Sequence, residues 1–277
     1  SRGRRTLWCG PLGLPMTTSE STTATSVSFF GDDSFDEQIF VIAGYVGTAE
    51  LWQETFKPRW RAILRTAPHS ITEFKASDCQ SRKGEFQGWT EHETVALTQQ
   101  LVSLIVEASA SKQCVGFGTA VVYPGVVDSS AEDATRMRRD LEKHGFGMAV
   151  GTTFADALNV AAGHCALLSI RDVALGVTHR VQPVMDRKDG FFHRVKSNFE
   201  SIGEHFLGPE VSAYINQPIV GDSRDLAPIQ AADLLAFEIR REIRNRCNRR
   251  GVRRALDRLV TEGQHRATCL SYPPIPE

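Results

Sequence analysis

The sequence is poor in the features that identify several large classes of protein. Only six of its 277 residues are cysteines, they are widely scattered, and no Cys-x-x-Cys pair occurs. A structural zinc site and a disulfide scaffold are therefore not expected, and reduced thiols in a cytoplasmic protein are the interpretation we favour. The chain also lacks Gly-x-x-x-x-Gly-Lys-Ser/Thr and Gly-x-Gly-x-x-Gly, which argues against the common nucleotide-binding loops.

Long apolar runs and an excess of charge of one sign are missing too. The most apolar later stretch, 155–175, contains Asp156, Arg171 and Asp172, so we expect a mostly buried helix there and no membrane span. The formal net charge is -1. The molecule as a whole is therefore not a polycation, and any contact with nucleic acid must use a local basic face.

The length and the 41% of hydrophobic residues are those of an ordinary globular chain. The polar residues 1–26 predict a disordered leader or an expression-derived segment, because they lack the apolar core of a secretory signal. We expect one α/β domain over 27–262, with a helical insertion near 131–175, and a C-terminal tail over 263–277.

Apolar periodicity mixes strands and helices throughout this domain. Strands are predicted at 25–32, 39–46, 113–123, 180–185 and 211–220. Helices are predicted at 49–65, 91–109, 131–144, 153–175, 190–205, 225–246 and 251–261.

Several aspartates fall where these predicted elements end. Asp32 and Asp33 are adjacent at the end of the first strand, where like-charge repulsion costs stability unless a cation or a turn accommodates it. Asp186 and Asp222 each follow a later strand, and Asp233 lies beside the apolar stripe of a helix. Carboxylates that converge in this way are the ligands that Mg²⁺ or Mn²⁺ prefers, and two such ions can promote phosphodiester cleavage.

Each aspartate also has a plain structural interpretation. Asp32 with Asp33, and Asp186 in Asp-Arg-Lys-Asp-Gly, suit turns, and Asp222 could cap the following helix. A core carboxylate such as Asp233 could bind a backbone amide or an arginine. Only the combination of these residues favours a metal site.

Three stretches carry a resemblance to a known family. They are FFGDDS, EFKASDCQSRKGEFQGW and DSRDLAPIQAADLLAFEIRR, and they resemble the domain-of-unknown-function 3800 family, which is similar to the ribonuclease H-like superfamily. The resemblance spans roughly 27–246 and implies a ribonuclease H-like mixed sheet flanked by helices. Its typical pattern opens with a strand ending in Asp-Asp/Glu-Ser-Gly and closes with Asp-Ser followed by Leu-Gln-x-Ala-Asp on a helix.

The resemblance implies a role for individual residues. Asp32, Asp186 and Asp233 would be the primary, catalytic metal ligands, and Asp33 or Asp222 would complete the site, with a metal-bound water as the nucleophile. Gln230 would support Asp233 from one turn earlier. The chain departs from the pattern in two places: Phe35 stands where a glycine is usual, and Lys75 stands where relatives carry the histidine of His-x-x-Asp. The second departure leaves the roles of Glu73 and Asp78 open.

The one strongly charged region is 240–258, with nine arginines against Glu242 and Asp257. Arg240, Arg241 and Arg244 are the candidates for phosphate contacts, and a solvated helix balanced by acidic neighbours is the alternative.

The sequence thus predicts a Mg²⁺- or Mn²⁺-dependent nuclease that hydrolyses RNA or DNA. A binding module of the same fold, for nucleic acid or protein and without catalysis, is the main alternative, and a phosphohydrolase acting on small esters is the third. The oligomeric state is not readable from these patterns.

Overall fold

A computed structural model of the chain describes residues 27–36, 39–111, 113–122, 181–187, 196, 216–248, 250, 253–263 and 265–271. The expected leader 1–26, the expected helices at 131–144 and 153–175 with their insertion, and nearly all of the expected helix at 190–205 lie outside these residues. None of the described helices has both the length and the apolar character needed to cross a membrane.

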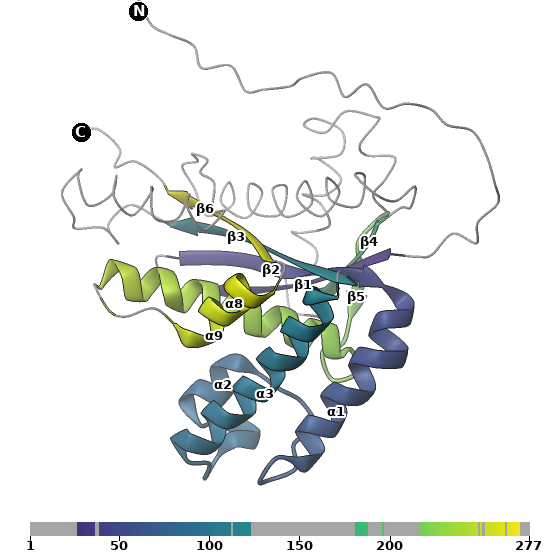
Figure 1. Ribbon diagram of the computed structural model, residues 1–277. Helices are drawn as coiled ribbons and strands as arrows, with labels where there is room; N and C mark the ends of the chain where they lie inside the picture. The colour runs from purple at the N-terminus through teal and green to yellow at the C-terminus, as the bar shows by residue number, and fades with distance from the viewer. Residues whose placement is uncertain are drawn as a thin grey trace, which may run out of the picture.

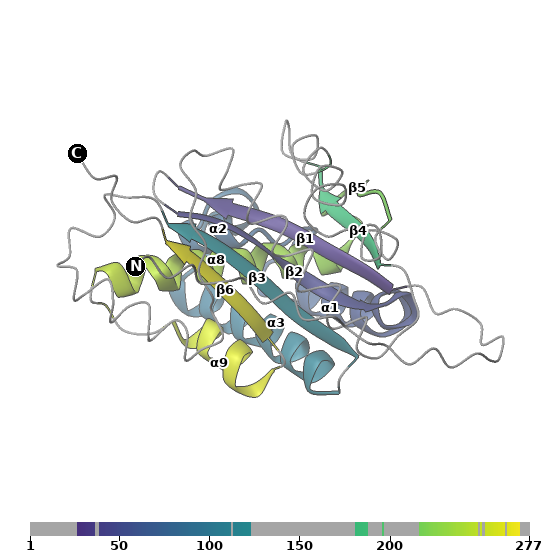
Figure 2. The same cartoon turned by 90° about the horizontal axis from the view of Figure 1, so that it is seen from above.

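The described strands form one mixed sheet of six strands in the order β5-β4-β1-β2-β3-β6. Strand β1 pairs antiparallel with β2, and β2 pairs antiparallel with β3. Strands β4 and β6 pair parallel with β1 and β3 respectively, and β5 pairs parallel with β4 (Figure 2). The bounds are β1 Val27–Phe35, β2 Ile39–Thr48, β3 Cys114–Val122, β4 Val181–Asp186, β5 Ile219–Gly221 and β6 His265–Ser271.

The described helices all cover one face of this sheet, and α8 runs directly beneath the strands (Figure 1). A π-helical turn η1 (Leu51–Phe56) continues into α1 (Lys57–Thr66), and α2 (Ala76–Ser81) leads through the short helix η2 (Gly84–Phe86) into α3 (Glu91–Ala110). The last two helices are α8 (Ala227–Cys247) and α9 (Arg254–Glu262). The chain is therefore an α/β protein, as the sequence predicts.

Helix α8 lies against the sheet because its sequence provides a continuous apolar face. Ile229, Ala232, Ala236 and Ile239, which the sequence predicts to face the core, are all 0 or 1% exposed. Alanines at two of these positions let the helix axis approach the strands closely. Burying such a face is the main source of stability for a helix in a globular protein.

Aromatic rings connect the first helix to the segment around α2. Trp52, Phe56, Trp60, Phe74 and Phe86 follow one another in edge-to-face or stacked contacts with ring centroids 5.2–6.1 Å apart. Such pairs add to the stability that the burial of their area already provides. These ring contacts hold the loop before α2 against α1.

Glycines permit two close approaches that the site depends on. A Cβ at Gly44 would collide with the backbone oxygen of Phe30, so the β1–β2 pair could not form with a larger residue there. A Cβ at Gly221 would meet Leu226 and Ile229 at the start of α8. The second glycine brings the end of β5 close to the first turn of that helix.

The structure corrects three boundaries. Strand β1, expected at 25–32 with the two aspartates at its end, continues to Phe35 along β2, so Gly31, Asp32 and Asp33 lie within the strand. The fifth strand was expected at 211–220, yet 216–218 are not strand and β5 is limited to Ile219–Gly221. The segment expected to form a tail contributes β6, which pairs parallel with β3, a long-range contact that local patterns do not reveal.

Candidate active site

Asp32 and Asp186 lie side by side at the end of the parallel ladder between β1 and β4. The last paired residues are Gly31 and Met185, so these two aspartates occupy the next equivalent positions on neighbouring strands. Equivalent positions on adjacent parallel strands are about 4.8 Å apart and direct their side chains to the same face. The structure therefore brings two of the three predicted catalytic carboxylates together.

The face that the pair shares is the one covered by helices. Phe30 and Val184, two residues before the aspartates on their strands, belong to the hydrophobic core that includes the buried side chains of α8. Because side chains alternate along a strand, Asp32 and Asp186 point the same way. Asp32 is 2% exposed and Asp186 is 8% exposed, so both carboxylates are largely removed from water.

Asp186 is a buried carboxylate that lacks a protein partner in the described part of the chain. No hydrogen bond or ion pair there involves its side chain, although its backbone pairs with Gly221. Burying a carboxylate without a hydrogen-bonding or charged partner costs roughly several kcal/mol. Such groups are therefore usually found with a bound cation or a proton. The position is chemically suited to a hard divalent ion.

Asp33 is not brought together with this pair. It pairs with Ile42 on β2, one residue after the Asp32–Ala43 pair, and alternation turns its side chain to the opposite face of the sheet. Its backbone N–H donates to Oδ1 of Asp32 at 2.7 Å. Asp33 thus contributes to the site through its backbone, and the prediction that its carboxylate completes the ligand set is not supported by this geometry.

Asp233 has a defined structural task. Its Oδ2 accepts a hydrogen bond of 2.7 Å from the backbone N–H of Ala76, the first residue of α2. A carboxylate at the start of a helix satisfies an N–H that has no partner within the helix and interacts favourably with the helix dipole. The sequence left open a backbone-amide role for Asp233, and the structure shows this contact.

Gln230, predicted to support Asp233, binds the same stretch of chain one turn earlier on α8. Its Oε1 accepts from the backbone N–H of Phe74 at 2.9 Å and from Trp60 Nε1 at 2.8 Å. Its Nε2 donates to the carbonyl of Ser223 at 2.6 Å. The Gln-x-x-Asp spacing therefore lets α8 hold alternate N–H groups of the extended segment 74–76, and it joins this segment to the loop before α8.

Asp222 serves mainly as a turn residue. Its carbonyl accepts from the N–H groups of Asp225 and Leu226 at 3.0 Å, and its Oδ1 accepts from the N–H of Arg224 at 3.0 Å. These contacts build the turn between β5 and α8, which is the structural interpretation that the sequence left open. Asp222 directly follows Gly221, the backbone partner of Asp186, so it remains close to the carboxylate pair in the fold.

Glu73, whose role the sequence left open, lies between two exposed cations. Ser223 Oγ donates to its Oε1 at 2.5 Å, Lys75 Nζ is 3.8 Å from the same oxygen, and Arg224 Nε is 3.9 Å from Oε2. Sequence reasoning missed Lys75, Ser223 and Arg224 as candidates. The signal was present, because all three lie within the stretches that carry the family resemblance.

Asp78, the other residue in doubt, closes α2. Its carbonyl accepts from the N–H groups of Arg82 and Lys83, and Arg82 takes the left-handed conformation that ends the helix. Nothing in these contacts links Asp78 to the carboxylate pair.

A complete metal-binding group is not found among the described residues: no three or more His, Cys, Asp or Glu side chains there are gathered around a common point. The structure thus brings together Asp32 and Asp186, while Asp233 is turned to Ala76, Asp222 to its own turn, and Asp33 to the opposite face of the sheet.

Two of the three predicted phosphate-binding arginines, Arg240 and Arg244, are engaged within the fold. Arg240 donates to Ser34 Oγ at 2.8 Å and to Asp36 Oδ2 at 3.0 Å, and Arg244 Nη2 is 2.7 Å from Asp36 Oδ1. The same two arginines therefore clamp the end of β1 to α8. For Arg241, burial together with the neighbouring Arg253 and Arg240 lowers the pKa. The geometry favours the alternative of a charge run balanced by acidic neighbours.

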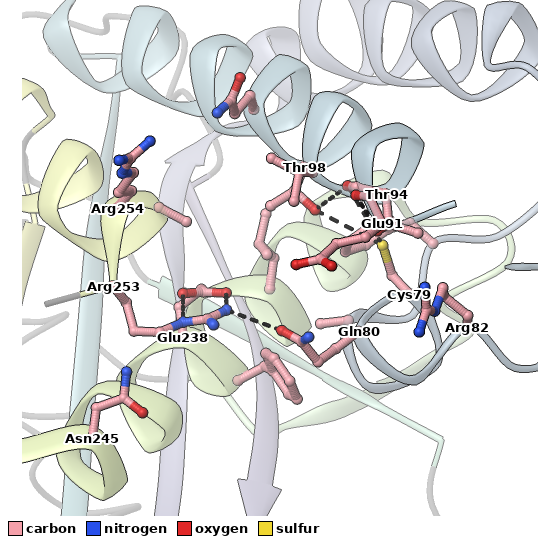
Figure 3. Close-up of a pocket in the computed structure, with 17 residues that line it drawn as sticks. Cys79, Gln80, Arg82, Glu91, Thr94, Thr98, Glu238, Asn245, Arg253 and Arg254 are labelled. Atoms are coloured by element: carbon pink, nitrogen blue, oxygen red, sulfur yellow. Dashed lines mark hydrogen bonds and ion pairs between the residues drawn. The ribbon is translucent and has the colours of Figure 1, made fainter. Parts of the chain in front are cut away.

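A pocket of about 570 Å³ lies between α2, α3, α8 and α9 (Figure 3). One wall carries the ion pair of Arg253 with Glu238, whose carboxylate is 2% exposed and is held by two guanidinium hydrogen bonds of 2.9 and 2.6 Å. Cys79 lies opposite, beneath Thr94 and Thr98, and burial raises the pKa of its thiol to about 11. This thiol is therefore protonated at neutral pH and unsuited to nucleophilic catalysis.

No protein-family model matches the chain, and no curated protein sequence is significantly similar to it. The family resemblance described above therefore stays a prediction that depends on three short stretches.

Proposed function

We propose that the protein is a divalent-metal-dependent phosphodiesterase that cleaves RNA or DNA on a ribonuclease H-like fold. The observation that carries this proposal is the pairing of Asp32 with Asp186 at equivalent positions on neighbouring parallel strands, largely buried and on the helix-covered face. Two like charges on neighbouring strands repel each other, and a bound cation would relieve that repulsion.

The strand order supports the fold part of the proposal. Three consecutive antiparallel strands, β1 to β3, continue on the other side of β1 into the parallel strands β4 and β5. This arrangement is the one expected of a ribonuclease H-like sheet, and β6 is an addition at the far edge. The two free cysteines of the described chain, Cys79 and Cys114, agree with a reducing, cytoplasmic setting.

The donor chemistry of the pair fits Mg²⁺ or Mn²⁺. Carboxylate oxygens suit both ions, and Asp186 is a buried carboxylate for which the described residues provide no counter-charge. Asp32 and Asp186 would hold the ion, with the nearby Asp222 as a further donor. A bound divalent ion would polarise a phosphoryl oxygen and lower the pKa of a water molecule.

Asp33, Gln230 and Asp233 position the parts of the chain around the carboxylate pair. The N–H of Asp33 donates to Oδ1 of Asp32 and so fixes the orientation of that carboxylate. Gln230 and Asp233 hold the segment 74–76 against α8, and Gln230 also holds the loop that carries Asp222. The helix-covered side of the pair is thereby kept rigid.

The test compares two matched substitutions of the same kind. Asp186→Asn removes a carboxylate of the pair, whereas Asp257→Asn removes an exposed one from α9. Cleavage of labelled single- and double-stranded RNA and DNA is measured in Mg²⁺ and in Mn²⁺, and Mn²⁺ affinity is measured by calorimetry. We expect Asp186→Asn and Asp32→Asn to lower both cleavage, by about 100-fold or more, and ion affinity, because charge stabilisation at a reacting phosphate is worth about that much.

The proposal also predicts the stability of the metal-free protein. Asp186→Asn should leave its melting temperature unchanged or raise it, since the substitution relieves like-charge repulsion. Divalent ions should stabilise the wild type by mass action, by about 2.7 kcal/mol when their concentration is 100 times Kd. A wild type that binds neither ion, or cleaves none of the four nucleic acids, would overturn the metal-dependent nuclease.

A binding module of the same fold is the second candidate, and one observation favours it. Asp233, the third predicted ligand, is hydrogen-bonded to the start of α2, as a purely structural residue would be. In that case the wild type binds nucleic acid or a protein partner in the presence of a chelator as tightly as in Mg²⁺, and cleaves nothing.

A further inference from the structure

Two exposed cations lie just before α2 and just before α8, and neither belongs to the arginine-rich segment. Lys75 and Arg224 have side chains that are 53% and 79% exposed, and they approach opposite oxygens of Glu73 at 3.8 and 3.9 Å. Glu73 itself is 12% exposed and receives the Ser223 hydroxyl at 2.5 Å. One partly buried carboxylate thus holds two cations from loops that are far apart in the sequence.

Both cation-bearing loops are fixed by Gln230. The side-chain oxygen of Gln230 holds the N–H of Phe74, directly before Lys75, and its side-chain nitrogen holds the carbonyl of Ser223, directly before Arg224. Gln230 is 3% exposed, and Trp60 also donates to its oxygen. The two loops are therefore positioned by one buried amide that makes three hydrogen bonds.

The same loops lead directly to the candidate carboxylates. Arg224 follows Asp222 by two residues, and Asp222 follows Gly221, the backbone partner of Asp186. Lys75 precedes Ala76, whose N–H binds Asp233. The chain thus connects Arg224 to the strand beside Asp186 and Lys75 to the segment held by Asp233, whereas Arg240 and Arg244 contact Asp36.

We propose that Lys75 and Arg224 bind the phosphate backbone of a nucleic-acid strand beside the Asp32–Asp186 site, with Glu73 as the residue that positions both. This inference rests on the proposed function, and it names the residues that contact substrate. Lysine contributes a point charge with three donors, and arginine a planar fork that matches two phosphate oxygens. Both side chains are more than half exposed, so a ligand in solution can reach them.

Phosphate contacts have a measurable signature that a surface ion-pair network lacks. Each contact releases condensed counterions, so the logarithm of the affinity falls with the logarithm of salt by about 0.9 per neutralised phosphate on duplex DNA. Such contacts are indifferent to base sequence. A network that only stabilises the two loops would change the free energy of unfolding and leave this slope unchanged.

The experiment measures binding of a fluorescent duplex and a fluorescent single strand by catalytically inactive protein, Asp186→Asn, from low to moderate salt. The test variant adds Lys75→Ala with Arg224→Ala. The control adds Arg82→Ala with Lys83→Ala, which removes the same charge from exposed residues beyond the opposite end of α2. A third variant adds Glu73→Gln, which removes the competing carboxylate and keeps its size.

We expect the test variant to bind at least about tenfold more weakly at low salt. The slope of log affinity against log salt concentration should become shallower by about two, one unit for each lost phosphate contact. The control variant should lose little of either, and Glu73→Gln should bind as tightly as its parent or more tightly. Equal losses in the test and control variants, or an unchanged slope in the test variant, would overturn the assignment. Thermal melting of every variant identifies losses that are due to unfolding, and Lys75→Arg should retain binding where Lys75→Ala does not.

The outcome can be separated from that of the proposed function. If the wild type binds nucleic acid through Lys75 and Arg224 but does not cleave it, this inference holds and the proposed nuclease function is overturned. The wild type could instead hydrolyse bis(p-nitrophenyl) phosphate in Mn²⁺ and bind neither the duplex nor the single strand. That result would support a metal-dependent phosphodiesterase acting on small esters and would overturn the nucleic-acid contacts.

Discussion

The arginine-rich segment and the carboxylate site differ in how their charges are satisfied. In the described part of 240–258, Arg240, Arg244, Arg253 and Arg258 each hold an acidic side chain of the same protein. By contrast, Asp186 is buried without a described partner, and Lys75 and Arg224 share the single carboxylate of Glu73 at 3.8 and 3.9 Å with side chains 53% and 79% exposed. The density of charge along a sequence therefore does not locate a binding surface, because the fold decides which charges are already used.

The largest effect on stability is expected where a charge pair is most buried. Glu238→Ala leaves the guanidinium of Arg253, with a side chain 23% exposed, without its bidentate partner. Breaking a buried ion pair in this way costs about 3–5 kcal/mol of unfolding free energy. Urea denaturation measures it, with Glu262→Ala as the control, because the Glu262–Arg258 pair is exposed and is worth about 0.2–1 kcal/mol. Equal losses for the two variants would show that the arginine-rich segment is not anchored as the structure indicates.

A smaller effect is expected from Arg240→Ala combined with Arg244→Ala. Both arginines are partly buried on Asp36, so their loss should lower the free energy of unfolding by roughly 1–3 kcal/mol. Nucleic-acid affinity of the folded variant should stay near that of the wild type, whereas the original sequence interpretation predicts that it falls. Denaturation and salt-dependent binding on the same samples separate the two. Unchanged stability with weakened binding would restore these arginines as the phosphate-binding surface.

The smallest effect at neutral pH concerns Cys79, which lies on α2 between the two regions. Burial raises the pKa of its thiol from the model-peptide value of 9.0 to about 11. A group whose pKa is raised by folding stabilises the protein fully below its unfolded pKa, and this contribution is lost as the pH rises from about 9 towards about 11. The native thiol should also be inert to alkylating reagents at pH 8, measured by mass spectrometry. Rapid labelling of Cys79 in folded protein would show that the pocket between α2 and α3 opens.

Local chemistry was sufficient to predict much of the fold and part of the site. The periodicity of apolar residues predicted β1, β2, β3, β4, α3, α8 and α9 close to their observed bounds, because each has one face or both faces buried. Short elements such as α2 and β5, and the edge strand β6, were missed or misplaced, since long-range partners and not local patterns define them. The sequence also identified Asp32 and Asp186 as acids on strands, although β1 continues beyond Asp32, and their neighbouring positions follow once those strands pair in parallel.

What only the tertiary structure decided is the role of each polar group. The sequence determined an α/β chain with aspartates on its strands and a Gln-x-x-Asp helix, as these depend on residue type and spacing alone. The tertiary fold turned Asp233 to the N–H of Ala76, paired Arg240 and Arg244 with Asp36, and placed Lys75 and Arg224 around Glu73. These contacts join residues that are far apart in the chain or separated by a turn. Sequence spacing does not identify these partners, because each hydrogen bond or ion pair forms only when the fold brings the two residues together.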